Sequence, residues 1–244
     1  NNILSLGIEV KCNLELGRNL DLEELTEKYD AVFLSFGANI SAKMNIEGEE
    51  LDSVYGANEV LEGKRTVDYT GKKVVVIGGG NVAMDMARTA KKNGAKDVKV
   101  IYRRSRKEMP AEVKEIEEAE KEGIEFLFQN NVTKITPQKI ECIKTELIKK
   151  EGDSRLSPVN IDGSNYLLDA DLVFMAVGSK VDSSVINKLN LAINKYGYID
   201  VDEKYRTSNE KIYAGGDLVG EKSTVAWAAR SGRETAKSII SNII

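Results

Sequence analysis

The chain has 244 residues, a formal net charge of −4, two cysteines and no histidine. The lack of histidine excludes a Ser-His-Asp or Cys-His hydrolase and a histidine-ligated zinc or haem site. Because Cys12 and Cys142 form no CxxC pair, a dithiol redox site, a four-cysteine iron–sulfur site and a zinc ribbon are all disfavoured.

The same composition bears on the cellular location of the protein and on its partners. Two lone cysteines and no secretory signal predict a reducing, cytoplasmic location. The negative charge disfavours nucleic acid as a partner, and apolar runs such as residues 172–177 are far too short to cross a bilayer. We therefore expect no nucleic-acid and no membrane partner, and if the protein is an enzyme we expect a cofactor to carry the chemistry.

Short apolar runs alternate with amphipathic stretches along the chain, which predicts an α/β fold. The expected strands are residues 30–37, 73–77, 98–102, 124–128, 171–178 and 211–214. The expected helices are residues 21–28, 57–61, 81–93, 111–122 and a long one from about Ser223. Residues 48–71 are expected to be mostly loop, and residues 132–168 a small antiparallel meander.

The first candidate site is the GxGxxA pattern of residues 78–83, which lies between an expected strand and helix in a βαβ unit. Gly78 permits a tight turn, Gly80 lets the backbone approach a pyrophosphate, and Ala83 allows close helix–strand packing. Free N–H groups at the helix start would face the phosphates. This context predicts a dinucleotide site rather than an ordinary glycine-rich turn.

The second candidate site follows the next expected strand. An NAD site carries Asp or Glu there, about 20 residues beyond the glycine motif, to bind the ribose 2′-hydroxyl. This chain instead has Arg103 and Arg104, with Arg106 close by. A guanidinium is permanently charged and binds phosphate in a bidentate manner, so the exchange favours NADPH over NADH. The alternative is a solvated basic turn.

A third candidate lies near the end of the chain. Gly216 and Asp217 follow an expected strand, where the carboxylate could accept hydrogen bonds from sugar hydroxyls. The helix start near Thr224 and Val225 could present N–H groups to a polar ring edge. Local reasoning alone favours a Gly-Asp turn followed by a core helix.

Together these motifs resemble a known family. Residues 74–126, with the strings GGGNVAMD and YRRSRKEMPA, resemble the NADPH-binding domain of the glutamate synthase small (beta) subunit. Related flavoproteins share the pattern: the NADPH–ferredoxin oxidoreductase large subunit and the N-terminal half of dihydropyrimidine dehydrogenase. The strings YDAVFLSFGA, DADLVFMAVGS and TSNEKIYAGGDLVGEKSTVAWAARSGRETA also look like this family.

The resemblance implies a Rossmann-like NADPH-binding domain at residues 66–188, carrying the antiparallel meander. This domain would be inserted into the remainder of a second, FAD-type Rossmann-like domain at residues 1–65 and 189–244. The implied NADPH-binding residues are Gly78, Gly80, Asn81, Val82, Arg103 and Arg104, with Gly178 passing close to the cofactor. The implied flavin-side residues are Gly216, Asp217, Thr224 and Val225.

The chain departs from the family in lacking its cysteine-rich iron–sulfur region and the first βαβ unit of its FAD domain. We therefore expect a C-terminal fragment that binds NADPH but does not hold FAD tightly. We also expect a homodimer of the fragment to cover the sheet edge and apolar faces that the missing unit would leave exposed.

The resemblance also implies a function. In the parent enzyme, hydride would pass from NADPH to FAD, and electrons would continue to a glutamate synthase large subunit for reductive glutamate synthesis. No side chain of this chain would need to act as a general acid or base. Two alternatives stay open: an NADPH oxidoreductase subunit serving ferredoxin or another electron acceptor protein, and a nucleotide-binding module without turnover of its own.

Overall fold

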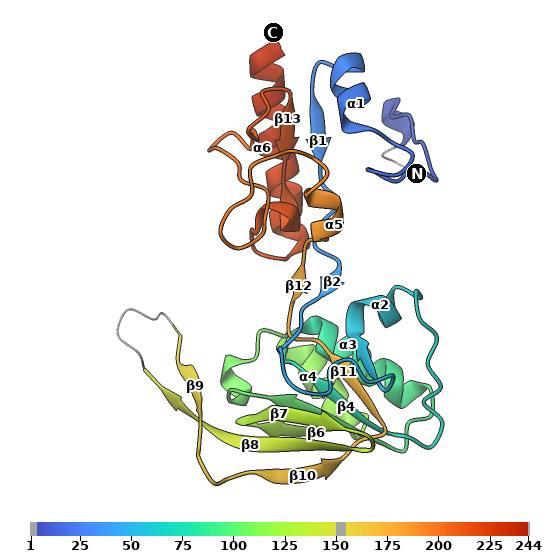
Figure 1. Ribbon diagram of the computed structural model, residues 1–244, viewed down its shortest axis with the longest axis vertical. Helices are drawn as coiled ribbons and strands as arrows, with labels where there is room; N and C mark the ends of the chain where they lie inside the picture. Colours follow the sequence, from blue (N-terminus) through green and yellow to red (C-terminus); the bar gives the residue numbers. More distant parts are fainter. Residues whose placement is uncertain (1–3, 150–154, 244) are drawn as a thin grey trace. The chain divides into compact units, whose positions relative to one another are not determined.

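The computed structural model describes residues 4–149 and 155–243, which form two compact units (Figure 1). The central unit is Asn39–Lys180, and the split unit combines Asn1–Ala38 with Val181–Ile244. One unit is thus inserted into the sequence of the other. The boundaries differ from the expected 66–188. β2 (Ile40–Ser41) pairs with β12 (Ser179–Lys180) inside the central unit, whereas Ile186 packs in the core of the split unit.

The central unit is built on a five-stranded, all-parallel sheet with the strand order β3-β11-β4-β5-β6. The strands are β3 (Val54–Gly56), β4 (Lys73–Ile77), β5 (Asp97–Tyr102), β6 (Glu125–Phe128) and β11 (Leu172–Met175). All four residues of β11 are buried, as are the last four of β4. Such unbroken apolar runs are typical of strands covered on both faces. β3 lies within the segment expected to be mostly loop.

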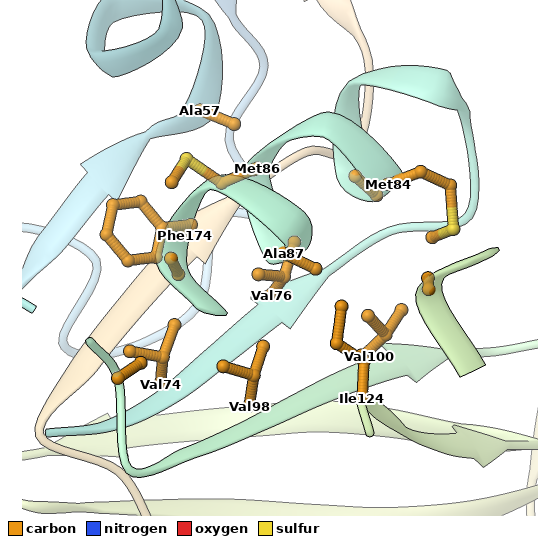
Figure 2. Close-up of a cluster of buried hydrophobic side chains, with 14 of the residues drawn as sticks. Ala57, Val74, Val76, Met84, Met86, Ala87, Val98, Val100, Ile124 and Phe174 are labelled. Carbon is orange, nitrogen blue, oxygen red and sulfur yellow. The ribbon is translucent and has the colours of Figure 1, made fainter. Parts of the chain in front are cut away.

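Helices cover one face of this sheet: α2 (Ala57–Leu61), α3 (Asn81–Lys92) and α4 (Val113–Lys121). Figure 2 shows Met86 of α3 beside the Phe174 ring of β11, and Ala87 beside Val76 of β4. Alternate strand residues point to opposite faces, so Val75 and Ile77 belong to a separate core on the other side.

An antiparallel sheet covers that other face, with Val132, Ile140 and Cys142 in the shared core. Its strands are β7 (Asn130–Thr136), β8 (Lys139–Ile148), β9 (Ser157–Asn160) and β10 (Tyr166–Asp169). β7, β9 and β10 all pair with β8. The sheet departs from a simple meander because the ten-residue β8 pairs with β10 along residues 139–142 and with β9 along residues 145–148. Burial raises the pKa of the Cys142 thiol to about 11, so this cysteine packs as a neutral side chain.

The split unit contains a parallel pair of strands, β1 (Val32–Leu34) and β13 (Ile212–Ala214). Its helices are α1 (Leu22–Lys28), α5 (Ser183–Ile186) and α6 (Val225–Ile243), with short 3₁₀ segments η1 (Leu4–Leu6) and η3 (Gly216–Val219). Leu34, Ile212 and Leu218 lie in its apolar core. A third 3₁₀ segment, η2 (Arg106–Glu108), belongs to the central unit.

Among the residues that the structure describes, none of the helices combines the length and the apolar character that a bilayer crossing requires. In the same part of the chain, no three histidine, cysteine, aspartate or glutamate side chains gather closely enough to hold a metal ion.

Candidate functional site

The glycine turn lies at the carboxyl end of β4. At this strand the order in which successive strands join the sheet changes direction. β5 and β6 follow on one side of β4, whereas β11 returns on the other. Open α/β sheets bind ligands in the crevice outside the carboxyl ends of their strands at such a switch point. The fold therefore gives Gly78, Gly79 and Gly80 the position that a nucleotide-binding turn requires.

The protein's own packing explains the first two glycines of the turn. Gly78 has a φ of +145°, and a Cβ atom there would lie 2.2 Å from the carbonyl oxygen of Ala176. At Gly79 a Cβ atom would lie 2.5 Å from the ring of Tyr102. Neither position can accept a side chain without rearrangement of its neighbours.

Gly80 differs from both of its neighbours. It is the N-cap residue of α3 with an ordinary φ of −92°, and a Cβ atom there would meet no heavy atom within 4 Å. Its carbonyl accepts the N–H of Ala83 at 3.0 Å. Within the described part of the chain, the N–H groups of Gly80, Asn81 and Val82 have no hydrogen-bond acceptor. Open space above three free amides at a helix start fits a pyrophosphate.

The side chain of Asn81 has a structural partner. Its Oδ1 atom accepts the N–H of Glu112 at 2.9 Å, and the carbonyl of Gly79 accepts the N–H of Ala111 at 3.1 Å. These bonds hold the segment before α4 against the glycine turn. They also explain why α4 begins at Val113 rather than at residue 111, since Glu112 is its N-cap residue and has a non-helical ψ of 134°. Asn81 is thus available to a ligand through its backbone N–H.

Arg103 and Arg104 follow β5, the strand beside β4. Their carbonyls accept hydrogen bonds from Thr145 Oγ1 at 2.8 Å and from the N–H of Gln129 at 3.0 Å, so the antiparallel sheet anchors the backbone. The Arg103 guanidinium is exposed and has no partner among the described residues. Arg104 is half-buried, and its Nε donates to the carbonyl of Leu156 at 3.0 Å.

Arg106 is engaged elsewhere. Its guanidinium pairs with Glu120 through Nη2–Oε2 at 2.7 Å and Nε–Oε1 at 3.2 Å, and this hydrogen-bonded pair raises the Arg106 pKa. On the same turn the Glu108 carboxylate accepts both the hydroxyl and the N–H of Ser105. These bonds, chiefly the one from the Ser105 hydroxyl, hold the pKa of Glu108 below its ordinary value of 4.5. Among the described residues, therefore, Arg103 and Arg104 have no carboxylate partner, whereas Arg106 has one.

Gly178 follows β11, next to the glycine turn. It has a φ of +124°, its carbonyl accepts the N–H of Ala42 at 2.9 Å, and a Cβ atom there would meet nothing within 4 Å. Because Gly78 packs against Ala176, the segment after β11 lies at the same sheet edge as the turn. The central unit thus brings the seven expected NADPH-side residues to the ends of three neighbouring strands.

The four expected flavin-side residues lie in the split unit. The N–H of Gly216 donates to Ser231 Oγ at 2.9 Å, which ties the turn after β13 to α6. Asp217 lies in η3. Thr224 precedes α6 and its hydroxyl accepts the N–H of Trp227 at 3.3 Å, while Val225 is 88% exposed. Local sequence reasoning missed the role of Ser231, because a buried serine in a helix carries no pattern of its own.

Comparison with known proteins supports the resemblance. The glutamate synthase [NADPH] small chain of Escherichia coli is 34% identical over 261 residues, covering 96% of this chain and 55% of that protein. The NADP(+)-dependent formate dehydrogenase subunit beta of Moorella thermoacetica is 36% identical over 250 residues, covering 97% of this chain and 35% of that protein. The chain thus spans about half or less of the length of these relatives.

A solved structure supports the fold. FprA from Mycobacterium tuberculosis in complex with NADPH superimposes with a TM-score of 0.82 at 20% identity, covering 95% of this chain and 67% of that one. The predicted Rossmann-like α/β class is confirmed. The family model of pyridine nucleotide-disulphide oxidoreductases matches residues 6–234. The chain therefore belongs to the pyridine nucleotide-disulphide oxidoreductase family.

Proposed function

We propose that the central unit binds NADPH, and that the chain is the NADPH-binding portion of a flavin-dependent oxidoreductase. FAD and NADPH are the cofactors of the family to which the chain belongs. One juxtaposition supports the proposal best. In the part of the chain that the structure describes, the amides at Gly80, at the end of β4, have no acceptor, and the Arg103 guanidinium, which follows the neighbouring strand β5, has no partner.

Each residue has a defined task in this proposal. The N–H groups of Gly80, Asn81 and Val82 bind the pyrophosphate, aided by the positive end of the α3 dipole. Arg103 and Arg104 bind the ribose 2′-phosphate with charge-assisted hydrogen bonds. Gly178, which carries no side chain, leaves room for the nicotinamide half of the cofactor.

The chemistry itself belongs to the cofactors: bound NADPH supplies a hydride, which FAD accepts. The residues of the central site bind and orient. None of them needs to donate or accept a proton, because hydride transfer between these cofactors requires no general acid from the protein. On the flavin side we propose Gly216, Asp217, Thr224 and Val225 as contacts, with the amides at the start of α6 facing the ring.

For the whole enzyme we propose reductive glutamate synthesis, with electrons passing to a glutamate synthase large subunit. The similarity to the glutamate synthase small chain supports this role. The comparable identity to a formate dehydrogenase subunit supports a second candidate, an NADPH oxidoreductase subunit with a different electron acceptor protein. A cytoplasmic location and a homodimer of this chain stay predictions, and the exposed Leu6, Ile8 and Val10 of the split unit favour the latter.

The test is a titration of NADPH and NADH against the wild-type chain, Arg103→Ala and Arg104→Ala. Losing one charge-assisted phosphate contact should weaken NADPH binding by about tenfold or more, with NADH binding unchanged. Arg106→Ala is the matched control, since it removes the same charge from the same turn but from a guanidinium that Glu120 already holds. Equal wild-type affinities for NADPH and NADH would contradict the proposal.

A further inference from the structure

The hairpin formed by β8 and β9 is bonded to the turn that carries Arg103 and Arg104. Thr145 on β8 donates its hydroxyl to the Arg103 carbonyl at 2.8 Å. Just before β9, the Leu156 carbonyl accepts Arg104 Nε at 3.0 Å, and Arg155 Nη2 donates to the Glu108 carbonyl at 2.9 Å. Three hydrogen bonds thus fix both arms of the hairpin on this turn.

These contacts bring an additional cation to the turn. Arg155 is exposed, and within residues 4–149 and 155–243 it has no carboxylate partner. Two other charged groups of the turn already have partners: Arg106 forms an ion pair with Glu120, and the Glu108 carboxylate accepts a hydrogen bond from the N–H of Ser105. Arg103, Arg104 and Arg155 therefore keep guanidinium N–H groups that no described carboxylate neutralises.

We propose that Arg155 is a third guanidinium of the 2′-phosphate site, reaching the NADPH ribose from the β8–β9 hairpin. The inference rests on the proposed function of Arg103 and Arg104. A phosphate monoester carries between one and two negative charges at neutral pH. Each of its three terminal oxygens can accept more than one hydrogen bond, so Arg103 and Arg104, even if both bind in a bidentate manner, leave acceptor positions for a third guanidinium. Arg155 supplies the additional donors, because its bond to the Glu108 carbonyl leaves its other N–H groups without an acceptor among residues 4–149 and 155–243.

The hairpin also positions Arg104. Because the Leu156 carbonyl occupies Arg104 Nε, the guanidinium is oriented before a ligand arrives, and its Nη groups have no acceptor among the described residues. Preorganised donors lose less conformational entropy on binding than a mobile side chain does. Preference for NADPH thus depends on two segments separated by about fifty residues of sequence rather than on the β5 turn alone.

The experiment uses two probes that differ only in the 2′-phosphate, adenosine 2′,5′-bisphosphate and 5′-AMP. We expect Arg155→Ala to weaken binding of the bisphosphate by about tenfold and to leave 5′-AMP binding unchanged. Arg155→Lys should restore part of the loss, because it keeps the charge but not the fork of donors. Lys144→Ala is the matched control: Lys144 is an exposed cation on β8, and as the neighbour of Thr145 it points to the opposite face of the strand.

Each outcome decides between the two proposals. If Arg155→Ala weakens both probes equally, Arg155 only holds the hairpin in place and the inference is overturned. If Arg103→Ala loses bisphosphate affinity and Arg155→Ala does not, the inference fails while the NADPH proposal stands. If the wild-type chain binds both probes equally, the proposed function fails together with the inference. A thermal unfolding measurement on every variant checks that each one keeps the native fold.

Discussion

The three adjacent glycines at the end of β4 differ in what a side chain would meet at each position. The carbonyl of Ala176 blocks a side chain at Gly78, and the Tyr102 ring blocks one at Gly79. At Gly80 the backbone is unstrained and the space is open, so nothing in the described structure itself excludes a side chain. Because Gly80 has no side chain, a ligand can reach the backbone N–H groups at the start of α3.

Replacing Gly80 should therefore separate binding from folding. We expect Gly80→Val to abolish NADPH binding with little change in thermal stability, because the side chain would fill the space that the pyrophosphate needs. Gly79→Ala should instead destabilise the fold by about 1–3 kcal/mol, since it overpacks the Tyr102 ring. Thermal unfolding and an NADPH titration on both variants provide the check. Wild-type NADPH affinity in Gly80→Val would show that the turn does not hold the cofactor.

A cluster of charges joins the two helices that frame the site. Arg88 of α3 pairs with three carboxylates of α4 and its C-cap, at 2.5 Å to Glu115, 2.8 Å to Glu118 and 2.9 Å to Glu122. Its hydrogen bond to Glu122 holds the pKa of that carboxyl below the ordinary 4.5. Since the unfolded chain binds the proton more readily, this contribution to stability is complete above about pH 4.5 and is lost as the pH falls.

We expect Arg88→Met to lower the melting temperature at pH 7, because it leaves three neighbouring carboxylates without their common partner. The difference from wild type should shrink in acid, as Glu122 becomes protonated in both proteins. Lys92→Met is the control, since Lys92 lies 3.8 Å from the same Glu122 but is largely exposed. A melting temperature of Arg88→Met that equals wild type at pH 7 would count against a stabilising role for the cluster.

The elements around the glycine turn are predictable because their signals are local. The apolar run of residues 73–77 matches β4, and the helix expected at residues 81–93 matches α3 to within one residue at its end. β3 carries no such signal: it has three residues and becomes a strand by pairing with β11. The start of α4 shifts for a similar reason, since Asn81 binds the amide of the residue before it.

The candidate site shows the same division. Spacing from the glycine motif predicts Arg103 and Arg104, because a βαβ unit fixes where the second strand ends. Arg155 has no such link, since the antiparallel sheet brings it to the turn only through tertiary contacts. The roles of the turn residues as cofactor contacts stay predictions, as do those of Gly216 and Asp217 in the split unit.

On the scale of the whole molecule, the sequence supplies one candidate phosphate-binding turn. The pattern GxG occurs once in the 244 residues, at residues 78–80, and one such turn holds one pyrophosphate. We therefore expect the purified chain to bind NADPH in about equimolar amount and to be colourless. An absorption spectrum measured with and without added FAD, after removal of free flavin, tests this. A flavin peak near stoichiometric occupancy would assign the turn to FAD or show that a second phosphate loop is dispensable.

The most direct test of the central claim is a crystal structure of this chain with NADP⁺. We predict that the pyrophosphate accepts hydrogen bonds from the amides of Gly80, Asn81 and Val82. The 2′-phosphate should lie between Arg103, Arg104 and Arg155. A nucleotide bound away from the end of β4, or a 2′-phosphate that points into solvent without touching Arg103 or Arg104, would contradict the account.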